Sequence, residues 1–456
     1  MKKEMIRTFR KVFPKSFSEA VAGVVRAVRA FFARVFYSNP ARDLKIIGIT
    51  GTNGKTTTVN MVNEILKAAG KKTAMFSTAV IEIDGERKVN DMNLTVLPVW
   101  ELNKFFALAR KSGVDYVVLE VSSMALDQKK LKHVRFEVAA LTNITQDHLD
   151  YHGSMERYAQ AKMLLFRDEP RFSVINRDDL WYEDFAKFGA GESVISYGYD
   201  KQSDVRILGQ KLYRKGTECT LKIGDKKLEL ATALAGEFNV YNMTLAATIG
   251  LALDLSDEAI AEGIANLDSL PGRFELVVDG AANDKGFDVV VDYAHTPDAL
   301  EQLLYSAREI LSAKKMENGR KAKVILVFGA MGERDAIKRP IMGRIAGEMA
   351  DKIFLTDEEN DREPRAKIRA EIMVGLKEAL SAVDVKRKVT EIEDRRAAIA
   401  EALRFASAGD MILITGLGHE VVRLLDGEKI TWSDKTVVLE LMSNHQLIDR
   451  YKSVIE

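Results

Sequence analysis

From Leu44 onward, apolar residues occur in short runs that alternate with longer stretches of helical spacing. Short runs rich in Val and Ile are typical of strands, and apolar residues that repeat every three or four positions are typical of helices. Their alternation predicts an α/β domain whose sheet is largely parallel. The predicted strands cover 45–50, 73–78, 115–121 and 138–144, and the first helix covers 57–69.

A second series of the same kind begins after Pro271-Gly272-Arg273, where we place a domain boundary. Residues 203–230 differ from both series, because they read as alternating strands with turns at Lys215-Gly216 and Gly224-Asp225. We expect them to form a β-rich insertion within the first α/β domain. The second series predicts strands at 288–294, 324–330, 352–357 and 411–416, and helices near 297–312, 340–350, 364–380 and 394–406.

The N-terminal segment is strongly basic, with ten Lys and Arg residues against Glu4 and Glu19 over residues 1–42. Its apolar residues recur at helical spacing and predict one face of a helix that Asn39-Pro40 should end. Two interpretations are open: the apolar face enters acidic lipid headgroups, or the helix docks on its own protein with its arginines solvated. The face comprises Val21, Val24, Val25, Val28, Phe31, Phe32, Val35 and Phe36, with Arg26, Arg29 and Arg34 elsewhere on the helix.

Composition is that of an ordinary globular protein: 456 residues, 46% hydrophobic, with 67 Lys and Arg against 67 Asp and Glu. At roughly 100–200 residues per domain, this length predicts two or three domains. The balanced charge argues against nucleic acid as a partner, and the lone Cys219 excludes an intrachain disulfide and a cysteine-based zinc cluster. No run approaches the roughly 20 apolar residues of a membrane-spanning helix, so we expect a cytoplasmic protein.

The strongest chemical signal is the sequence GITGTNGKTTT, which follows an apolar strand and precedes a helix. Glycines at such a junction let backbone N–H groups approach phosphate oxygens, a lysine supplies charge, and the next hydroxyl can ligate Mg²⁺. The strict pattern has glycine where Ile49 stands, so this is a variant phosphate-binding loop. A purely structural glycine turn is the alternative.

Two further strands end in residues suited to a site beside that loop. Glu120 ends the strand at 115–121, where a carboxylate could ligate magnesium, although it could equally cap a helix. The loop after the strand at 138–144 holds Asp147, His148, Asp150 and His152. Without context, such histidines would be solvated loop residues.

In their order and spacing, eight sequence blocks resemble the Mur ligases, most closely the MurE type. The resemblance covers about residues 44–440. The blocks are GITGTNGKTTT, LEVSSMALDQ, LTNITQDHLDYHGSMERYAQAK, GEFNVYN, PGR, VDYAHTPDAL, GERDAIKRP and GLGHE.

The resemblance implies an ATP-dependent amide ligase of peptidoglycan synthesis. Such an enzyme adds an amino acid to UDP-N-acetylmuramoyl-L-alanyl-D-glutamate through an acyl phosphate. It also implies three segments: a basic helical segment (1–43), a central P-loop ATPase domain with a mostly parallel sheet (44–271) and a Rossmann-like α/β domain (272–456). The alternatives are a folylpolyglutamate-synthase-like ligase and a non-catalytic scaffold that binds ATP.

Site residues follow from the same resemblance. Lys55, Glu120, His148 and Lys162 would be catalytic, with Thr56, Glu120, His148 and Lys162 around two Mg²⁺ ions. Lys162 stands where the family carries a carbamylated lysine, against the alternative of a surface helix lysine. The nucleotide would contact Gly51, Thr52, Asn53, Gly54, Lys55, Thr56, Thr57, Asn239, Asn242, Arg273, Asp292 and His295.

The muramoyl-dipeptide would contact Thr95, Ser122, Gln128 and Lys130 by the same matching. Three departures weaken this part of the match: Lys130 replaces an arginine, Val96 a threonine and Met124 a histidine. A lysine keeps the charge of an arginine but lacks its bidentate fork for a carboxylate. We therefore expect a similar carboxylate substrate without identical recognition.

The amino-acid pocket departs further, because Asp357-Glu358-Glu359-Asn360 stands where diaminopimelate-selecting enzymes have Asp-Asn-Pro-Arg. Asp357, Glu358, Gly416 and Glu420 match pocket positions, while Leu417 replaces a lysine. The acidic run favours a basic amino acid without a distal carboxylate, such as lysine or ornithine. The alternative is that the arginine is displaced to Arg362 rather than lost. A solvated acidic loop is a further alternative.

The last departure is at the N-terminus, where 43 residues precede Leu44 and the family's uridine-binding domain is not recognisable. We hypothesise that the basic helix substitutes for it. It would either grip the diphosphate of the substrate or bring the enzyme to the membrane, which makes peripheral membrane association a second expectation for location.

Overall fold

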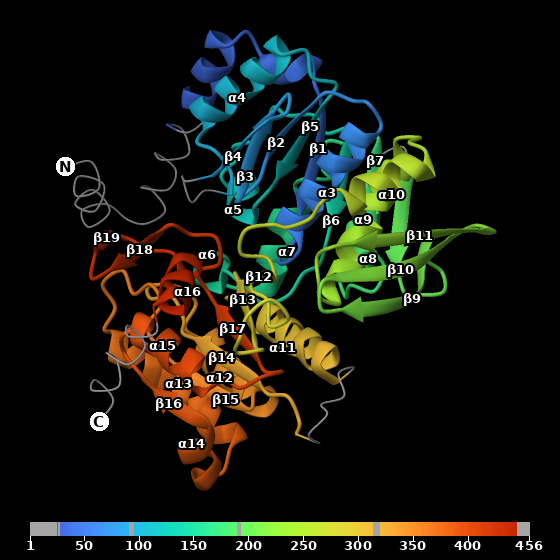
Figure 1. The fold of residues 1–456 in the computed structure, drawn as a ribbon. Coiled ribbons are helices and arrows are strands. Elements are labelled where there is room, and N and C mark those ends of the chain that lie inside the picture. The colour runs from blue at the N-terminus through green and yellow to red at the C-terminus, as the bar shows by residue number, and fades with distance from the viewer. Residues whose placement is uncertain (1–24, 26–27, 91–94, 189–192, 313–319, 445–456) are drawn as a thin grey trace.

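The computed structural model describes residues 25, 28–90, 95–188, 193–312 and 320–444. They form two α/β lobes, each built on its own sheet, as Figure 1 shows from blue to green and from yellow to red. The predicted α/β fold class is thereby confirmed. The last strand of the first sheet ends at Thr232, and the first strand of the second begins at Glu275.

The first sheet has eleven strands in the order β11-β10-β9-β8-β7-β6-β1-β5-β2-β3-β4. Strands from β9 to β2 in this order run parallel, while β3, β4, β10 and β11 add antiparallel edges. The central strands are buried on both faces, which is why their sequences are continuously apolar. The strands are β1 (Lys45–Thr50), β2 (Thr73–Phe76), β3 (Val80–Ile83), β4 (Glu86–Val89), β5 (Tyr116–Glu120), β6 (Val138–Leu141), β7 (Phe172–Asn176), β8 (Ser193–Gly198), β9 (Val205–Tyr213), β10 (Gly216–Ile223) and β11 (Lys226–Thr232).

Helices cover both faces of this sheet, and each face has its own apolar core. One core joins the sheet to α3 (Lys55–Ala68), α9 (Phe238–Ala252) and α10 (Asp257–Ala265). The other joins it to α4 (Val99–Lys111), α5 (Ser123–Asp127), α7 (Met155–Met163) and α8 (Tyr182–Lys187). The short helices η1 (Pro40–Asp43) and α6 (Leu149–His152) lie in connections.

The strands predicted at 203–230 are present as β9, β10 and β11, with turns between them at the predicted positions. They lie within the first lobe, where they were expected. There β9 pairs in parallel with β8 through Tyr197 and Val205, so these strands extend the main sheet. Local alternation of polar and apolar residues reveals the strands, but their partner lies in distant sequence.

The second lobe has a six-stranded sheet in the order β12-β13-β17-β14-β15-β16. One face packs against α11, α12 and α13, and the other against α15 and α16. Its strands are β12 (Glu275–Val278), β13 (Asp288–Asp292), β14 (Val324–Phe328), β15 (Lys352–Leu355), β16 (Val389–Glu391) and β17 (Met411–Thr415). The hairpin β18 (Val422–Leu425) and β19 (Glu428–Thr431) follows, and the helices are α11 (Pro297–Ser312), α12 (Lys338–Met349), α13 (Arg365–Ala379), α14 (Ala382–Lys388), α15 (Arg395–Phe405) and α16 (Asp434–Ser443).

The predicted N-terminal helix lies mostly outside the described residues. Its last part, residues 28–36, is helical and leads through Asn39 into η1. The described large apolar side chains of this helix are exposed, whereas Ala30 and Ala33 are buried. The helix therefore contacts the protein through Ala30 and Ala33, while its predicted apolar face is exposed at residues 28–36. No helix in the described ranges has the length and apolarity to span a membrane.

Candidate functional site

A cavity of about 650 Å³ lies where the two lobes meet, at the carboxyl ends of β1, β5 and β6. The order β6-β1-β5 places these three parallel strands side by side, so the loops that follow them converge. In open parallel sheets this edge is where ligands bind. The second lobe supplies the opposite wall, including Asp292, His295 and Asp298.

The glycine-rich loop between β1 and α3 forms the floor of the cavity. Gly51 and Gly54 have φ angles of 147° and 85°, and Gly54 directly precedes α3. A Cβ atom at Gly51 would lie 1.7 Å from Thr142 Oγ1, and one at Gly54 would lie 2.3 Å from Asn242 Oδ1. Backbone N–H groups at the start of α3 are therefore free to approach an anion, which the helix dipole favours.

Thr56 and Glu120 form a pair of oxygen donors beside this loop. Thr56 Oγ1 donates to Glu120 Oε2 over 2.9 Å, and the same oxygen accepts from the Thr78 N–H at 2.8 Å. Arg273, at the start of the second lobe, reaches across to Thr56 Oγ1 at 3.0 Å. A buried hydroxyl and carboxylate fit Mg²⁺, which prefers hard oxygen ligands and leaves further positions to phosphate and water.

Lys162, on α7, is only 1% exposed, so it is not a surface helix lysine. Its Nζ donates to the Gly51 carbonyl at 2.6 Å and lies 4.5 Å from the ring centre of Tyr158. Burial, reinforced by the nearby charge of Lys55, holds the pKa of Lys162 well below its usual value. A lowered pKa favours the neutral amine, which is the nucleophilic form of the side chain.

Lys55 also lines the cavity, with its Nζ donating to the Thr52 carbonyl at 2.7 Å. Burial lowers the pKa of Lys55, while the negative charges of Glu120 and Asp147 oppose that effect. The lysine is held over the loop, where its charge would be offset by a phosphate. The loop and the lysine thus form one anion-binding unit.

The loop after β6 places His148 and Asp147 together. His148 has a φ of 54°, and its Nε2 lies 3.3 Å from Asp147 Oδ2. Burial lowers the pKa of His148, whereas His148 and Lys338 of α12 hold the pKa of Asp147 at about 2. His152 is buried against Ser123, with 3.0 Å between Nε2 and Oγ. Neither histidine is a freely solvated loop residue.

The second lobe contributes polar groups that face the phosphate loop. Asn53 Nδ2 donates to Asp298 Oδ2 at 2.6 Å, which joins the loop to the start of α11. Asp292 accepts backbone N–H groups of Phe274 and Ala294, and burial raises its pKa. His295 is held by the Tyr293 carbonyl at 2.7 Å, and burial lowers the pKa of His295 to about 3, so its imidazole is neutral.

All the residues predicted to contact nucleotide line the cavity except Asn239. Asn239 lies behind Asn242 and accepts its Nδ2 at 2.9 Å. It therefore fixes the orientation of Asn242, whose Oδ1 faces Gly54. Asn239 is a positioning residue in this arrangement.

Four residues predicted to contact the muramoyl-dipeptide line the same cavity, on the side of the first lobe. Thr95 Oγ1 lies 3.3 Å from Thr78 Oγ1, and Ser122 caps α5 through the Ala125 N–H. Burial lowers the pKa of Lys130. The four residues are Thr95, Ser122, Gln128 and Lys130.

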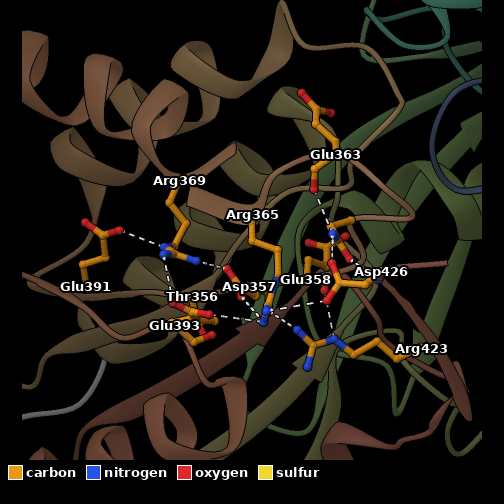
Figure 2. Close-up of polar contacts among 11 residues, drawn as sticks. Thr356, Asp357, Glu358, Glu363, Arg365, Arg369, Glu391, Glu393, Arg423 and Asp426 are labelled. Atoms are coloured by element: carbon orange, nitrogen blue, oxygen red, sulfur yellow. Dashed lines mark hydrogen bonds and ion pairs between the residues drawn. The ribbon is translucent and has the colours of Figure 1, made fainter. Parts of the chain in front are cut away.

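The acidic run after β15 divides into carboxylates with and without partners. Asp357 is occupied, because Arg369 contacts one of its oxygens and Arg365 Nη1 lies 3.2 Å from the other (Figure 2). It does not reach the cavity, contrary to its predicted role as a pocket residue. The backbone carbonyls of Asp357 and Glu358 accept the guanidinium of Arg423, which fixes the path of the run.

Glu358 and Glu420 are buried carboxylates that each keep one oxygen without a hydrogen-bond partner. Glu358 lies directly against Gly416, where a Cβ would be 2.1 Å from Glu358 Oε2, so neither residue lines the open cavity. Glu420 does line it and accepts from Tyr293 at 3.2 Å. Burial raises the pKa of Glu358 to about 7 and that of Glu420 to about 8.

Sequence reasoning missed several residues that the fold brings to the cavity. Arg334, Asp335 and Lys338 follow β14, and Glu359 follows β15. The first three belong to the block GERDAIKRP, which resembles the family but for which the sequence predicts no site residue. Asp298 lies in VDYAHTPDAL in the same way. Several charged residues follow each of these predicted strands, and that pattern is the signal that could have identified them.

Two family models match the chain and between them cover most of it. The Mur ligase middle domain matches residues 49–250. The Mur ligase glutamate ligase domain matches residues 272–418.

Curated relatives and solved structures point the same way. The UDP-N-acetylmuramoyl-L-alanyl-D-glutamate–2,6-diaminopimelate ligases of Syntrophomonas wolfei and Aquifex aeolicus are 37% and 38% identical to this chain. These alignments cover 91% and 92% of this chain and 82% and 81% of the relatives. A solved ligase of the same name is 28% identical, with a TM-score of 0.60, covering 89% of this chain and 80% of its own. Folylpolyglutamate synthase of Mycobacterium tuberculosis shares the fold at 20% identity, with a TM-score of 0.65. The superposition covers 85% of this chain and 92% of that synthase.

Proposed function

The chain belongs to the Mur ligase family, and on that premise we propose that it joins an amino acid to a muramoyl-dipeptide carboxylate using ATP. The observation that carries the proposal is one cavity that gathers the phosphate loop, Thr56 with Glu120, and the buried Lys162. Groups for binding phosphate and groups for holding a cation meet there at the carboxyl edge of the sheet.

The chemistry requires activation, because a carboxylate resists attack by an amine until one of its oxygens becomes a good leaving group. Transfer of the γ-phosphate of ATP to the substrate carboxylate makes an acyl phosphate. The amine then attacks the acyl carbon and releases inorganic phosphate. Lys55 and the backbone N–H groups at the start of α3 are positioned to offset charge on the transferred group.

Thr56 and Glu120 would hold one Mg²⁺, which supplies positive charge beside the phosphates. We propose that Lys162 carries a carbamate, because the amine is buried and its lowered pKa favours the neutral form, which adds carbon dioxide. The carbamate would convert a cation into an anion next to Gly51. Together with His148, it would serve as a ligand for a second Mg²⁺.

For the incoming amino acid, we propose a side-chain ammonium as the recognised group. Glu420 and Glu359 line the cavity, and Glu358 lies close behind Gly416. Burial raises the pKa of each, and an ammonium in the cavity beside Glu420 and Glu359 would favour their ionised state. Arginines at Asp357 are already occupied within the protein, so they are not free to pair with a distal carboxylate. This arrangement favours lysine or ornithine over diaminopimelate.

Trapping of the acyl phosphate tests the ligase proposal. We expect hydroxylamine, in place of the amino acid, to give the hydroxamate of UDP-N-acetylmuramoyl-L-alanyl-D-glutamate together with ADP. Lys55→Ala should abolish both products. Lys377 is an exposed residue of α13, so Lys377→Ala should leave both products unchanged. ADP formation that does not depend on the muramoyl-dipeptide would contradict the proposal.

A further inference from the structure

The helix at residues 28–36 is attached to the first lobe by its small residues and presents its large ones to solvent. Ala33 is fully buried, whereas Phe31, Phe32 and Phe36 are 51%, 60% and 68% exposed. Burying small residues and exposing aromatic ones is the reverse of what packing for stability favours. Within the described residues, the face, which also includes Val28 and Val35, is exposed, and exposed apolar patches of this kind often mark interaction sites.

Neighbouring aromatic residues enlarge this face. The rings of Phe36 and Trp100 lie 5.3 Å apart, and those of Tyr37 and Trp100 lie 5.8 Å apart. Arg110 of α4 donates to the Ser38 carbonyl at 3.1 Å, which fixes the end of the helix on the lobe. Trp and Tyr with one apolar and one polar end are enriched where proteins meet membrane interfaces.

A groove of about 960 Å³ opens beside the same helix, and Arg34 forms part of its wall. It is basic on balance, because seven Lys and Arg residues line it against four carboxylates, Asp43, Glu137, Asp168 and Glu169. Within the described part of the chain, five of its cations have no carboxylate within ion-pair distance, whereas Arg167 and Arg171 are paired. Burial, helped by the charges of Arg34 and Lys132, lowers the pKa of His133 in the groove. The five cations are Arg34, Arg42, Lys45, Lys132 and Arg135.

The groove lies at the amino ends of the strands of the first sheet, and the cavity lies at their carboxyl ends. Lys45 begins β1, and the phosphate loop follows its last residue, Thr50. Six residues of strand separate the two by about 20 Å. In Figure 1 the helix lies in dark blue beside α4 at the top of the molecule, far from the second lobe. This position does not suit a grip on the diphosphate of a substrate whose carboxylate reacts at the phosphate loop.

We propose that this face, defined as Val28, Phe31, Phe32, Val35, Phe36 and Trp100 with the adjoining basic groove, docks on an anionic lipid bilayer. Exposed apolar side chains enter the interface between headgroups and acyl chains, while the unpaired cations contact lipid phosphates. The cavity at the other edge of the sheet stays open to solvent. The inference goes beyond the proposed ligase function and does not depend on it.

Charge complementarity is what selects a bilayer over a second copy of the chain. Two copies meeting through this face would bring two sets of unpaired cations together, and like charges repel across an interface. The sequence of residues 1–42 adds eight further Lys and Arg besides Arg34 and Arg42, against only two acidic residues before Asp43. Clusters of Lys and Arg next to an apolar helix face are typical of proteins that bind acidic lipids.

Co-sedimentation of the full-length protein with lipid vesicles tests this proposal without nucleotide or substrate. Vesicles of phosphatidylglycerol and phosphatidylcholine should bind the protein at least about tenfold more tightly than vesicles of phosphatidylcholine alone. Phe32→Ser with Phe36→Ser should weaken binding to the mixed vesicles by at least about tenfold, because both rings leave the interface. Lys132→Glu with Arg135→Glu should weaken it by a similar factor.

Matched controls separate the face from general surface chemistry. Leu180→Ser with Val383→Ser removes apolar residues elsewhere that are more exposed than Phe32 and Phe36, and Lys377→Glu with Lys386→Glu reverses equal charge on the second lobe. Both controls should bind as the parent chain does. Equal affinity for neutral and anionic vesicles, or binding that survives both test variants, would overturn the proposal. So would a dimer in light scattering that Phe32→Ser with Phe36→Ser dissolves, because a second copy would then be the occupant.

Discussion

At the scale of single residues, burial shifts the pKa values of ionisable side chains in the cavity. Lys162 is the clearest case, since its amine is buried and its pKa is held well below the usual value. If it carries a carbamate that ligates magnesium, Lys162→Ala should lower ligase turnover by roughly 10- to 100-fold. Depletion of bicarbonate and carbon dioxide should lower turnover of the parent chain as well, in an assay of ADP formation.

The matched control is Lys187, an exposed lysine on α8. Lys187→Ala should keep full turnover, and depletion of carbon dioxide should not affect the residual rate of Lys162→Ala. Full turnover by Lys162→Ala would contradict a role for the carbamate.

Glu420 is predicted to destabilise the protein without substrate as the pH rises. Its pKa is about 8 in the fold against an ordinary value of 4.5. When folding raises the pKa of a group, its contribution to stability is fully present below the pKa of the unfolded chain. That contribution is lost as pH rises through the pKa in the folded protein. Between about pH 4.5 and pH 8, the midpoint of thermal unfolding of Glu420→Gln should therefore rise relative to that of the parent chain.

Addition of the cognate amino acid should reduce this difference, because its ammonium would stabilise the ionised Glu420. Glu378→Gln, an exposed glutamate on α13, is the control and should show no such pH dependence. A difference between Glu420→Gln and the parent chain that stays constant with pH would show that Glu420 is ionised in the fold.

At the scale of elements, the junction of β1 and α3 depends on glycine for its conformation. Gly51→Ala would place a methyl group against Thr142 and force an alanine into a φ of 147°. We expect it to weaken ATP binding by at least about tenfold, because the N–H groups of the loop would move away from the phosphates. Gly209→Ala in β9, with open space around it, is the control in a titration with a fluorescent ATP analogue. Equal affinities of the two variants would contradict the account of the loop.

The central strands could be predicted from the sequence, but the edges of the first sheet could not. Strands such as β1, β5 and β14 are buried on both faces, so their sequences are continuously apolar. The edge strand β4 is exposed along its length and carries no such pattern. For residues 28–36, periodicity indicated which large apolar side chains share a face but could not show that Ala30 and Ala33 would be buried instead. Which face packs is decided by tertiary contacts.

At the scale of the whole molecule, the site exists only because two lobes meet. Asn53 and Asp298 are 245 positions apart in sequence, and Thr56 and Arg273 are 217 apart. Motifs within one lobe, such as the phosphate loop and Glu120, were accessible to sequence reasoning because strand ends in a parallel sheet converge. Contacts across the lobes were not, which is why Lys338 beside Asp147 received no role. The domain limits at 43 and 271 stay predictions.

The central claim is an ATP-dependent ligation to a muramoyl-dipeptide, and the mass of the product tests it most directly. Purified protein would be incubated with ATP, Mg²⁺, bicarbonate and UDP-N-acetylmuramoyl-L-alanyl-D-glutamate, against an equal mixture of lysine, ornithine and meso-diaminopimelate. We expect one amino acid to be added per muramoyl-dipeptide with matching formation of ADP, and the product to contain lysine or ornithine. Addition of diaminopimelate would overturn the proposed pocket while leaving the ligase intact. The absence of any product from a chain that binds ATP and Mg²⁺ would contradict the central claim.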